Sequence, residues 1–405
     1  MKKLGIKGLF FLVPTLLILG VFSFWPVIQS LAYTFFDYQL NDQQKAGLYL
    51  SERFNVDLFD ETSFYVSRFL EEELDIVTDS NDQEEMTKMM KRIDKMGETF
   101  SDVEEKVIKI SDEEKMKIEQ LYKDASSLVS QLNQKYELTH KEDLPALVED
   151  LQNSIIPSNF IGMKGYKNAL SDSRIGIALW NTTLFTVVSV FIELVLGLGL
   201  ALILNKAIFG QGLIRTTSLI PWAIPTAVAA LMWSYLYDGS SGIIALFFEH
   251  LGLVEDSRNL LLSGGGAMVS TILADVWKTT PYMALLLLAG LQNIPGPLYE
   301  AASIDGAGKI QSFFRVTLPL LKPSILVALL FRTLDAFRVF DLIYVLTGGG
   351  PGGATETLSV YTYKVMFGQT NFGYGSVIVM LMFACVATIA ILFIKVLGAN
   401  LMEKN

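Results

Sequence analysis

Six apolar runs, each about 20 residues or longer, dominate this chain of 405 residues. A helix of about 20 residues is roughly 30 Å long, which is the thickness of the hydrocarbon core of a bilayer. The mean hydropathy of +0.40 and the 51% share of hydrophobic residues agree with this arrangement. The sequence therefore predicts an all-α integral membrane protein and excludes a soluble globule. The six runs are residues 9–35, 175–204, 214–237, 267–290, 323–346 and 374–398.

The first run resembles a secretory signal, because Lys2, Lys3 and Lys7 precede it. It continues through Trp25 and Tyr33, however, and has no clear small-residue cleavage site. The apolar core of a signal peptide is only about 7 to 15 residues long. We therefore expect a retained transmembrane helix.

Lysine and arginine in the short loops predict the orientation, since cytoplasmic loops are enriched in both. The opposite loop, 238–266, carries four acidic residues against Arg258 alone. We therefore expect both termini and the loop at 297–318 to be cytoplasmic. The basic residues behind this expectation are Lys2, Lys3, Lys7, Lys206, Arg215, Lys309, Arg315, Lys322 and Lys404.

One large polar segment, residues 41–170, separates the first run from the second and divides the chain into 1–40, 41–170 and 171–405. It holds 28 acidic and 16 basic residues, a net charge of −12, whereas the remaining 14 acidic and 16 basic residues give +2. Such an acidic, exported segment excludes nucleic acid as a partner. Apolar residues from Asp82 to Leu138 recur at steps of three and four, which predicts amphipathic helices. A small helical cap domain and a mobile spacer both remain open.

Residues that could catalyse a reaction or bind a metal are scarce. Cys385 is the only cysteine and lies in the last apolar run, while His140 and His250 are isolated and are expected to be solvated loop residues. The stretch Gly306 to Lys309 resembles the end of a phosphate-binding loop, but Ser303 and Ile310 break that motif. We therefore expect no catalysis, no metal and no cofactor in this chain.

The loop at 297–318 has the composition of two short helices. Pro297 suits a first helical turn, and Asp305 with Gly306 supplies a break. The second helix, from about Gly308 to Thr317, has one apolar and one basic face, and Pro319 is expected to end it. Such a segment either lies on lipid headgroups or docks on a cytoplasmic partner.

Charged residues inside the apolar runs mark a second candidate site. Asp275 and Lys278 lie near the middle of one run, and Arg332 and Asp335 near the middle of another. Each such charge costs about 2.5 to 3.5 kcal/mol at the bilayer centre, so these groups must be paired or face water. Ion pairs that hold the helices together and a polar cavity that includes Thr279 and Tyr282 are the two interpretations, and the set as a whole favours the cavity. Glu193, Arg338 and Asp341 are given no ligand role.

The loop carries a family resemblance. It is similar to the EAA signature of binding-protein-dependent ABC importer permeases, in which this loop enters a cleft of a cytoplasmic ATPase. The resemblance implies a type I importer core of six helices and a coupling role for the matching positions. These are Glu300, Ala301, Ala302, Asp305, Gly306, Ala307, Phe313 and Pro319.

Further positions resemble the carbohydrate branch of that family, related to the maltose permease MalF, over residues 9–40 and about 160–400. In that branch the sugar is held by residues that match Asp275, Lys278, Thr279, Tyr282, Arg332 and Asp335, of which Tyr282 alone keeps its type. The insert departs from most members, although the maltose permease carries an extracytoplasmic domain at the same place. The resembling positions are Trp180, Asn181, Thr182, Pro221, Pro225, Trp277, Pro281 and the run 337–351.

The resemblance implies a sugar or oligosaccharide substrate and an assembly in the bacterial inner membrane. Its members are a second, MalG-like permease, two copies of a cytoplasmic ATPase and an extracytoplasmic sugar-binding protein. Two rival classes stay open on the residues alone. One is a secondary transporter or channel that uses the aspartate and arginine residues as an ion relay, and the other is an anchored signalling protein whose insert is the sensor.

Overall fold

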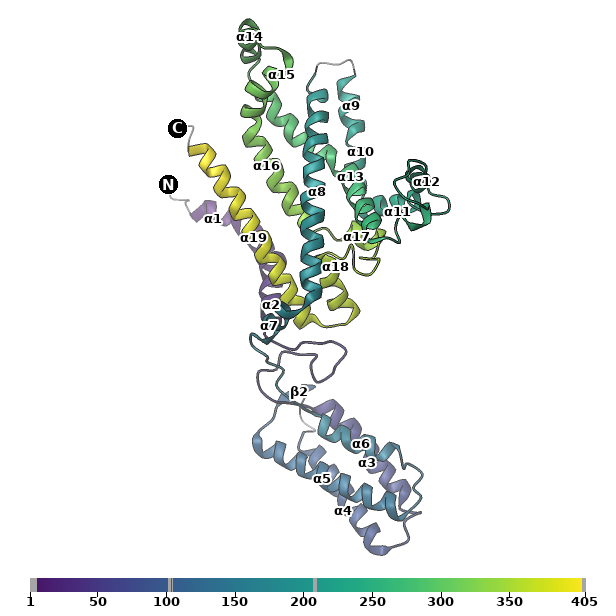
Figure 1. Ribbon diagram of the computed structural model, residues 1–405. Helices are drawn as coiled ribbons and strands as arrows, with labels where there is room; N and C mark the ends of the chain where they lie inside the picture. The colour runs from purple at the N-terminus through teal and green to yellow at the C-terminus, as the bar shows by residue number, and fades with distance from the viewer. Residues whose placement is uncertain (1–5, 101–102, 104, 207–209, 403–405) are drawn as a thin grey trace. The chain divides into compact units, whose positions relative to one another are not determined.

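A computed structural model describes residues 6–100, 103, 105–206 and 210–402 of the chain (Figure 1). Two compact units are present. The insert unit comprises Ala32–Gly165 and Thr370–Gly373, and the membrane unit comprises Met1–Leu31, Tyr166–Gln369 and Tyr374–Asn405.

The insert unit is mainly helical. Its helices are α3 (Val56–Glu73), α4 (Ser80–Glu98), α5 (Asp112–Lys135) and α6 (Asp143–Asn153). A small antiparallel sheet joins them, with β1 (Arg53–Asn55) between β2 (Val107–Lys109) and β3 (Ile155–Ile156). The amphipathic pattern predicted α4 and α5, whereas strands of two or three residues leave no such pattern.

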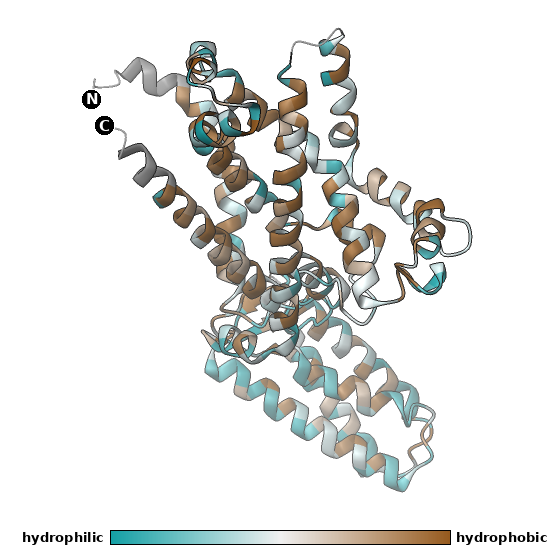
Figure 2. Ribbon diagram, turned by 45° about the horizontal axis from the view of Figure 1, so that its top comes forward, coloured by the Kyte–Doolittle hydropathy of each residue, from teal (hydrophilic) through white to brown (hydrophobic). Residues whose placement is uncertain are grey.

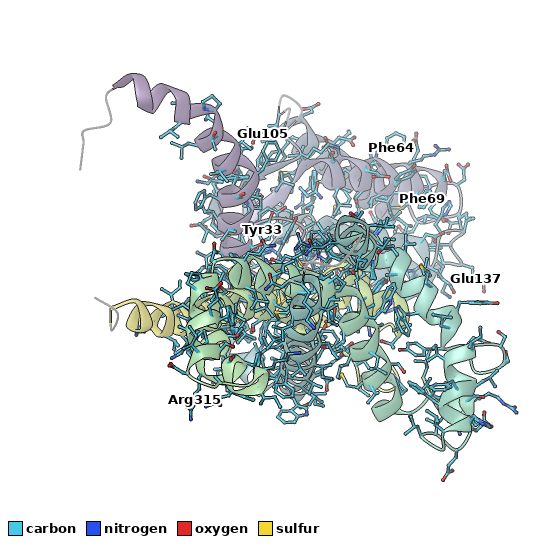
Figure 3. The ribbon with its side chains drawn as sticks, turned by 90° about the horizontal axis from the view of Figure 1, so that it is seen from above. Tyr33, Phe64, Phe69, Glu105, Glu137 and Arg315 are labelled. Atoms are coloured by element: carbon cyan, nitrogen blue, oxygen red, sulfur yellow. The ribbon has the colours of Figure 1, made fainter. Side chains whose placement is uncertain are left out.

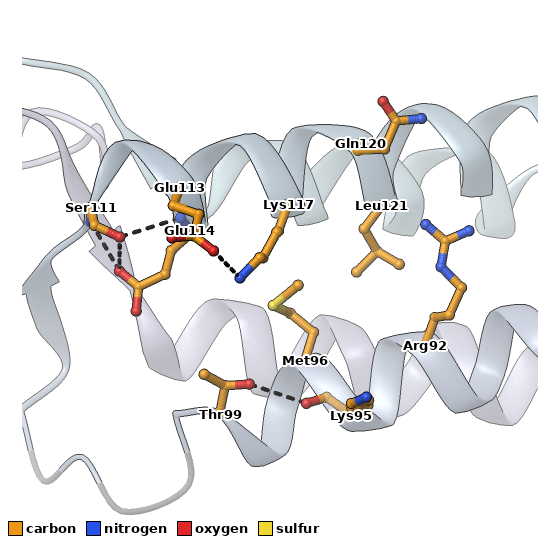
Figure 4. A pocket seen from close by; sticks show the side chains of 10 residues that line it. All are labelled: Arg92, Lys95, Met96, Thr99, Ser111, Glu113, Glu114, Lys117, Gln120 and Leu121. Atoms are coloured by element: carbon orange, nitrogen blue, oxygen red, sulfur yellow. Dashed lines mark hydrogen bonds and ion pairs between the residues drawn. The ribbon is translucent and has the colours of Figure 1, made fainter.

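Polar side chains fix where these helices begin. Asn55 accepts a hydrogen bond from the backbone N–H of Leu58 at the start of α3. Ser111 and Glu114 form a reciprocal capping box at the start of α5, with distances of 3.3 Å and 2.9 Å (Figure 4). Such caps satisfy N–H groups that have no partner within the helix.

The apolar faces of α3 to α6 meet in one core, in which Phe54, Phe59 and Ile93 are fully buried. His140 packs at the edge of this core. The sequence suggested a solvated loop residue, and this expectation is wrong for His140. Its ring stacks on Phe69 with centroids 3.9 Å apart, and its Nε2 lies 3.0 Å from Glu72.

The membrane unit contains five helical stretches that are long and apolar enough to span a bilayer. Figure 2 shows apolar residues along their surfaces. The first is formed by α1 (Ile6–Leu19), a π turn at Gly20–Phe24 and α2 (Trp25–Tyr33). The others contain α8 (Ser173–Leu204), α13 (Gly264–Gln292), α16 (Leu318–Phe337) and α19 (Phe372–Met402).

The predicted span 214–237 is not one helix but three, which corrects the expectation from hydropathy. They are α9 (Gln211–Ser218), α10 (Ile220–Ala223) and α11 (Thr226–Leu236). Ile224 and Pro225 adopt extended ψ angles of 132° and 135°. A proline disfavours helical geometry at the preceding residue, so Pro225 explains the break.

The predicted span 323–346 also has different limits. A continuous helical stretch runs from Lys309 to Phe337, and Asp341–Leu346 forms a separate short helix, α17. Pro319 does not end the preceding helix as expected. A π turn at Phe313–Thr317, closed by a bond from the N–H of Leu318 to the carbonyl of Phe313, precedes it. This wider turn lets the proline ring continue the helix.

Shorter helices complete the membrane unit. They are α7 (Lys164–Ser171), α12 (Ile243–His250), α14 (Gly296–Ile304), α15 (Lys309–Ser312), α18 (Leu358–Tyr363), a 3-10 turn at Ser257–Asn259 and a π turn at Lys364–Gly368. Helices α14 and α15 lie at one end of the unit, and α18 lies at the other (Figure 1).

Helices α8 and α13 approach closely where Gly197 faces Met283. A Cβ atom on Gly197 would lie 2.7 Å from Cγ of Met283 and 3.2 Å from the backbone nitrogen of Ala284. Without a side chain at this position, the two backbones can come together.

We expect Gly197→Ile to separate these helices and to lower stability by about 1 to 3 kcal/mol, because overpacking forces side chains off their rotamers. Gly199→Ile is the matched control, since nothing lies within 4 Å of a Cβ at that position. Thermal unfolding of the detergent-solubilised protein measures the difference. Equal midpoints for the two variants would contradict the packing described.

Candidate functional site

A polar cavity of about 430 Å³ lies inside the membrane unit. Helices α10, α13, α16 and α17 contribute most of its wall. Its lining residues are Trp222, Thr226, Asp275, Lys278, Thr279, Arg332, Asp335, Ala336, Arg338, Val339, Phe340, Asp341 and Leu342.

Arg332 is the centre of a buried ion cluster next to this cavity, with only 1% of its surface exposed. Its Nε and Nη2 donate to the two carboxylate oxygens of Glu193 at 2.5 Å and 2.9 Å. Nη2 also donates to Asp275, and Nη1 donates to Asp335 at 3.2 Å. The guanidinium thus ties α8, α13 and α16 together through charge-assisted hydrogen bonds.

Glu193 is the member of this cluster that the sequence analysis missed. It is fully buried in α8, and the hydroxyl of Thr279 lies 2.8 Å from its Oε1. A lone acid in an apolar helix of 32 residues was the available signal, because an intramembrane charge needs a partner. Nothing in the local sequence said that this partner is 139 residues away.

Lys278 does not form the expected ion pair with Asp275. Its Nζ donates instead to the backbone carbonyls of Trp222 and Ile224, at 3.2 Å and 2.9 Å. The break before Pro225 leaves these carbonyls without helical partners, and an unsatisfied carbonyl in hydrocarbon is costly. Lys278 therefore stabilises the broken third span.

Of the sequence-predicted site residues, Asp335 is the most accessible charged one, with 66% of its side chain exposed. Tyr282 is not among the lining residues. Its ring stacks on Trp222, which does line the cavity, with centroids 5.4 Å apart and an interplanar angle of 14°. An exposed carboxylate and an aromatic ring that line the same cavity can bind hydroxyl groups and an apolar ring face together.

A second ion cluster lies at the α18 end of the unit, just after the glycine-rich stretch 348–353. Glu356 is 3% exposed and accepts hydrogen bonds from Arg174 at 2.7 Å and 2.9 Å and from Lys364 at 2.8 Å. Burial alone raises the pKa of Glu356, but these hydrogen bonds outweigh it and hold the pKa below its ordinary value. The stabilisation is therefore present above the pKa of the unfolded chain and is lost as the pH falls through the lowered value.

The predicted coupling residues form a sharp bend between α14 and α15. Gly306 has φ +79°, and its N–H donates to the carbonyl of Ser303 at 3.1 Å. The N–H of Ala307 donates to the carbonyl of Ala302 at 2.8 Å. These two bonds make a Schellman motif, in which glycine is the residue that adopts the left-handed conformation without strain.

The bend presents an exposed surface. Ile304, Ile310 and Phe314 are 86%, 77% and 60% exposed. Glu300 and Arg315 are exposed beside them, and Figure 3 shows the side chain of Arg315 projecting outward. The hydroxyls of Tyr299 and Thr317 lie 3.0 Å apart and join α14 to the start of the membrane-spanning helix.

The insert unit also contains a groove of about 610 Å³ between α4 and α5 (Figure 4). Its cationic side chains are partly neutralised, since Arg92 pairs with Asp124 and Lys117 pairs with Glu113. Over the residues that the structure describes, no group of three or more histidine, cysteine, aspartate or glutamate side chains could hold a metal ion.

Comparison with known proteins identifies the family. The model of the binding-protein-dependent transport system inner membrane component matches residues 193–402, which is just over half of the chain. The chain belongs to this family. The matched region contains the α14–α15 bend, the cavity and Glu193.

Relatives of this permease agree with that assignment. It is 46% identical over 237 residues to the trehalose/maltose transport system permease protein MalF of Thermococcus litoralis, covering 58% of this chain and 79% of the relative. It is 46% identical over 242 residues to the trehalose transport system permease protein SugA of Mycobacterium tuberculosis, covering 59% and 76%. The sulfoquinovosyl glycerol transport system permease protein SmoG of Agrobacterium fabrum is 40% identical over 242 residues, covering 60% and 78%.

A solved structure supports the fold. A bacterial ABC transporter involved in the import of the acidic polysaccharide alginate matches with a TM-score of 0.54 and 21% identity, over 59% of this chain and 84% of that chain. The expectation of a type I ABC importer core is thereby confirmed, and the permease is a multi-pass protein of the inner membrane.

Proposed function

We propose that this permease is one of two membrane subunits of an ATP-driven importer of sugars. The second subunit is a similar permease, and the others are two copies of a cytoplasmic ATPase and an extracytoplasmic sugar-binding protein. The named relatives belong to transport systems for trehalose/maltose, for trehalose and for sulfoquinovosyl glycerol, which supports a saccharide as the substrate.

One observation carries the proposal: the bend that presents an exposed apolar and basic surface is continuous with a helix that lines the cavity. The helical stretch from Lys309 to Phe337 begins at the bend and includes Arg332 and Asp335. Docking of an ATPase on Glu300 and Ala301 to Ala307 thus acts directly on the cavity wall. The chain itself performs no covalent chemistry in this scheme.

Charge sets the orientation that we propose. The α14–α15 bend carries Lys309 and Arg315 and faces the cytoplasm together with both termini. The chain enters α8 directly after the insert, and α8 begins at the end of the membrane unit opposite to α14 (Figure 1). The acidic segment 41–170 is then extracytoplasmic, where it is available to the binding protein.

Reconstitution of the four-component complex in liposomes tests the proposal. Uptake of labelled sugar is expected to need ATP on the ATPase side and to be lost in Glu300→Lys, together with co-purification of the ATPase. Glu255→Lys, at an exposed position outside the bend, is the matched control and is expected to retain both. Uptake that persists without ATP and follows a proton gradient would instead support a secondary transporter.

A further inference from the structure

The buried charged groups at the cavity balance one another, and the exposed ones do not. This distribution of charge bears on which saccharides the permease accepts. Glu193 and Asp275 are buried anions, and Arg332 and Lys278 are buried cations, with exposed fractions of 0%, 6%, 1% and 7%. The buried part therefore carries no net charge. At the exposed part, Asp335 and Asp341 outnumber Arg338 by one.

Most donors of the two buried cations are already bound to the protein. All three nitrogens of Arg332 donate to carboxylates, and four of its five N–H groups are used by Glu193, Asp275 and Asp335. Two of the three protons of Lys278 are donated to the carbonyls of the broken span. One N–H of Arg332 and one proton of Lys278 remain, which is too few for an anionic ligand to bind Arg332 through its Nε and Nη2 edge. Such binding would displace Glu193 and leave a buried carboxylate without its partner, which is costly.

The exposed charged groups that remain for a ligand are Asp335, Asp341 and Arg338, and their net charge is negative, which favours a neutral ligand over an anionic one. The carboxylate of Asp335 accepts hydrogen bonds and repels another anion. Trp222, held flat by Tyr282, offers an aromatic face. Hydroxyl groups and the apolar face of an uncharged sugar ring complement this pair.

We propose that Glu193 is a specificity-determining positioning residue: by occupying the Nε and Nη2 edge of Arg332 it makes the cavity select neutral saccharides over anionic ones. This inference rests on the proposed function, because it assumes that the cavity holds the transported sugar.

Binding to the purified complex, measured by equilibrium dialysis, tests the inference. The probes are trehalose and maltose, each paired with an analogue in which one 6-hydroxymethyl group is oxidised to a carboxylate. The native complex is expected to bind the neutral member roughly tenfold more tightly or better, as expected for like charges brought together.

Two variants move the charge balance in the same direction. Glu193→Gln removes the negative charge beside one edge of Arg332 and retains an oxygen acceptor. Asp335→Asn removes the exposed carboxylate, and we expect this variant to fold because the Asp335 side chain is 66% exposed. Each is expected to narrow the preference for the neutral sugar by roughly tenfold. Glu255→Gln makes the same charge change away from the cavity and is expected to leave the preference unchanged.

The outcomes separate the two proposals. Native protein that binds the anionic analogues as tightly as the neutral sugars overturns the inference, as does an unchanged preference in folded Glu193→Gln. Binding of none of the four probes, with no saccharide imported by the reconstituted complex, overturns the proposed function instead.

Discussion

Replacing Arg332 by methionine is expected to prevent the membrane unit from folding stably. The guanidinium neutralises Glu193 and Asp275, which are 0% and 6% exposed. Without it, two buried carboxylates face each other within an apolar bundle. Removal of one partner from a buried ion pair costs about 3 to 5 kcal/mol, because the other charge stays buried and unpaired. The amount of protein in the membrane fraction and the unfolding midpoint in detergent measure the effect.

Two comparisons show whether charge is the cause. Arg338→Met removes an exposed arginine six residues further along the chain, whose Nε contacts only the carbonyl of Leu334, and is expected to change stability little. The triple change Glu193→Gln, Asp275→Asn and Arg332→Met removes all three charges and is expected to recover much of the loss. A stable Arg332→Met single variant would mean that the cluster does not hold the helices together.

Replacing Gly306 by proline is expected to abolish ATP-driven uptake while the membrane unit stays folded. Gly306 has φ +79°, whereas proline is confined to about −65°, so α14 and α15 cannot keep their bend. The substitution also removes the N–H that bonds to Ser303. Because the bend is exposed, the change acts on docking of the ATPase rather than on the core. Co-purification of the ATPase and sugar uptake in liposomes measure the loss.

Gly308→Pro is the matched control, two residues away on the same exposed segment. Gly308 has φ −71°, which is close to the angle that proline imposes. Uptake by this variant is expected to stay close to that of the native permease. If both variants retained the ATPase, the conformation at Gly306 would not be needed for coupling.

The sequence predicted six spans, of which five correspond to helical stretches long and apolar enough to cross a bilayer, and it predicted the limits of the helices less well. Hydropathy reports how apolar a window is, so it joined α9, α10 and α11 into one span and α16 and α17 into another. The breaks depend on backbone geometry at Ile224 and Pro225 and at Arg338 to Phe340, which a window average does not register. At Pro319 the sequence predicted the end of a helix that in fact continues, because the preceding π turn accommodates the proline.

At the cavity, residue type predicted which side chains need a partner, but the sequence did not predict which groups pair. Intramembrane charge correctly marked Asp275, Lys278, Arg332 and Asp335 as residues that need partners, and the structure brings them to one cavity. The sequence left open which groups pair, and of the two pairs spaced three residues apart only Arg332 and Asp335 form an ion pair. Glu193 and the carbonyls of Trp222 and Ile224 are far away in sequence, so only the folded bundle reveals them.

The continuous helical stretch from Lys309 to Phe337 connects the α14–α15 bend to the cavity. Its 29 residues extend over about 43 Å at the rise of an α-helix and include the π turn at Phe313–Thr317 between the α14–α15 bend and Arg332. A change of tilt at Lys309 is therefore expected to be transmitted to Arg332, whose guanidinium also binds Glu193 of α8 and Asp275 of α13. We therefore expect α8, α13 and α16 to move together when the α14–α15 bend is displaced.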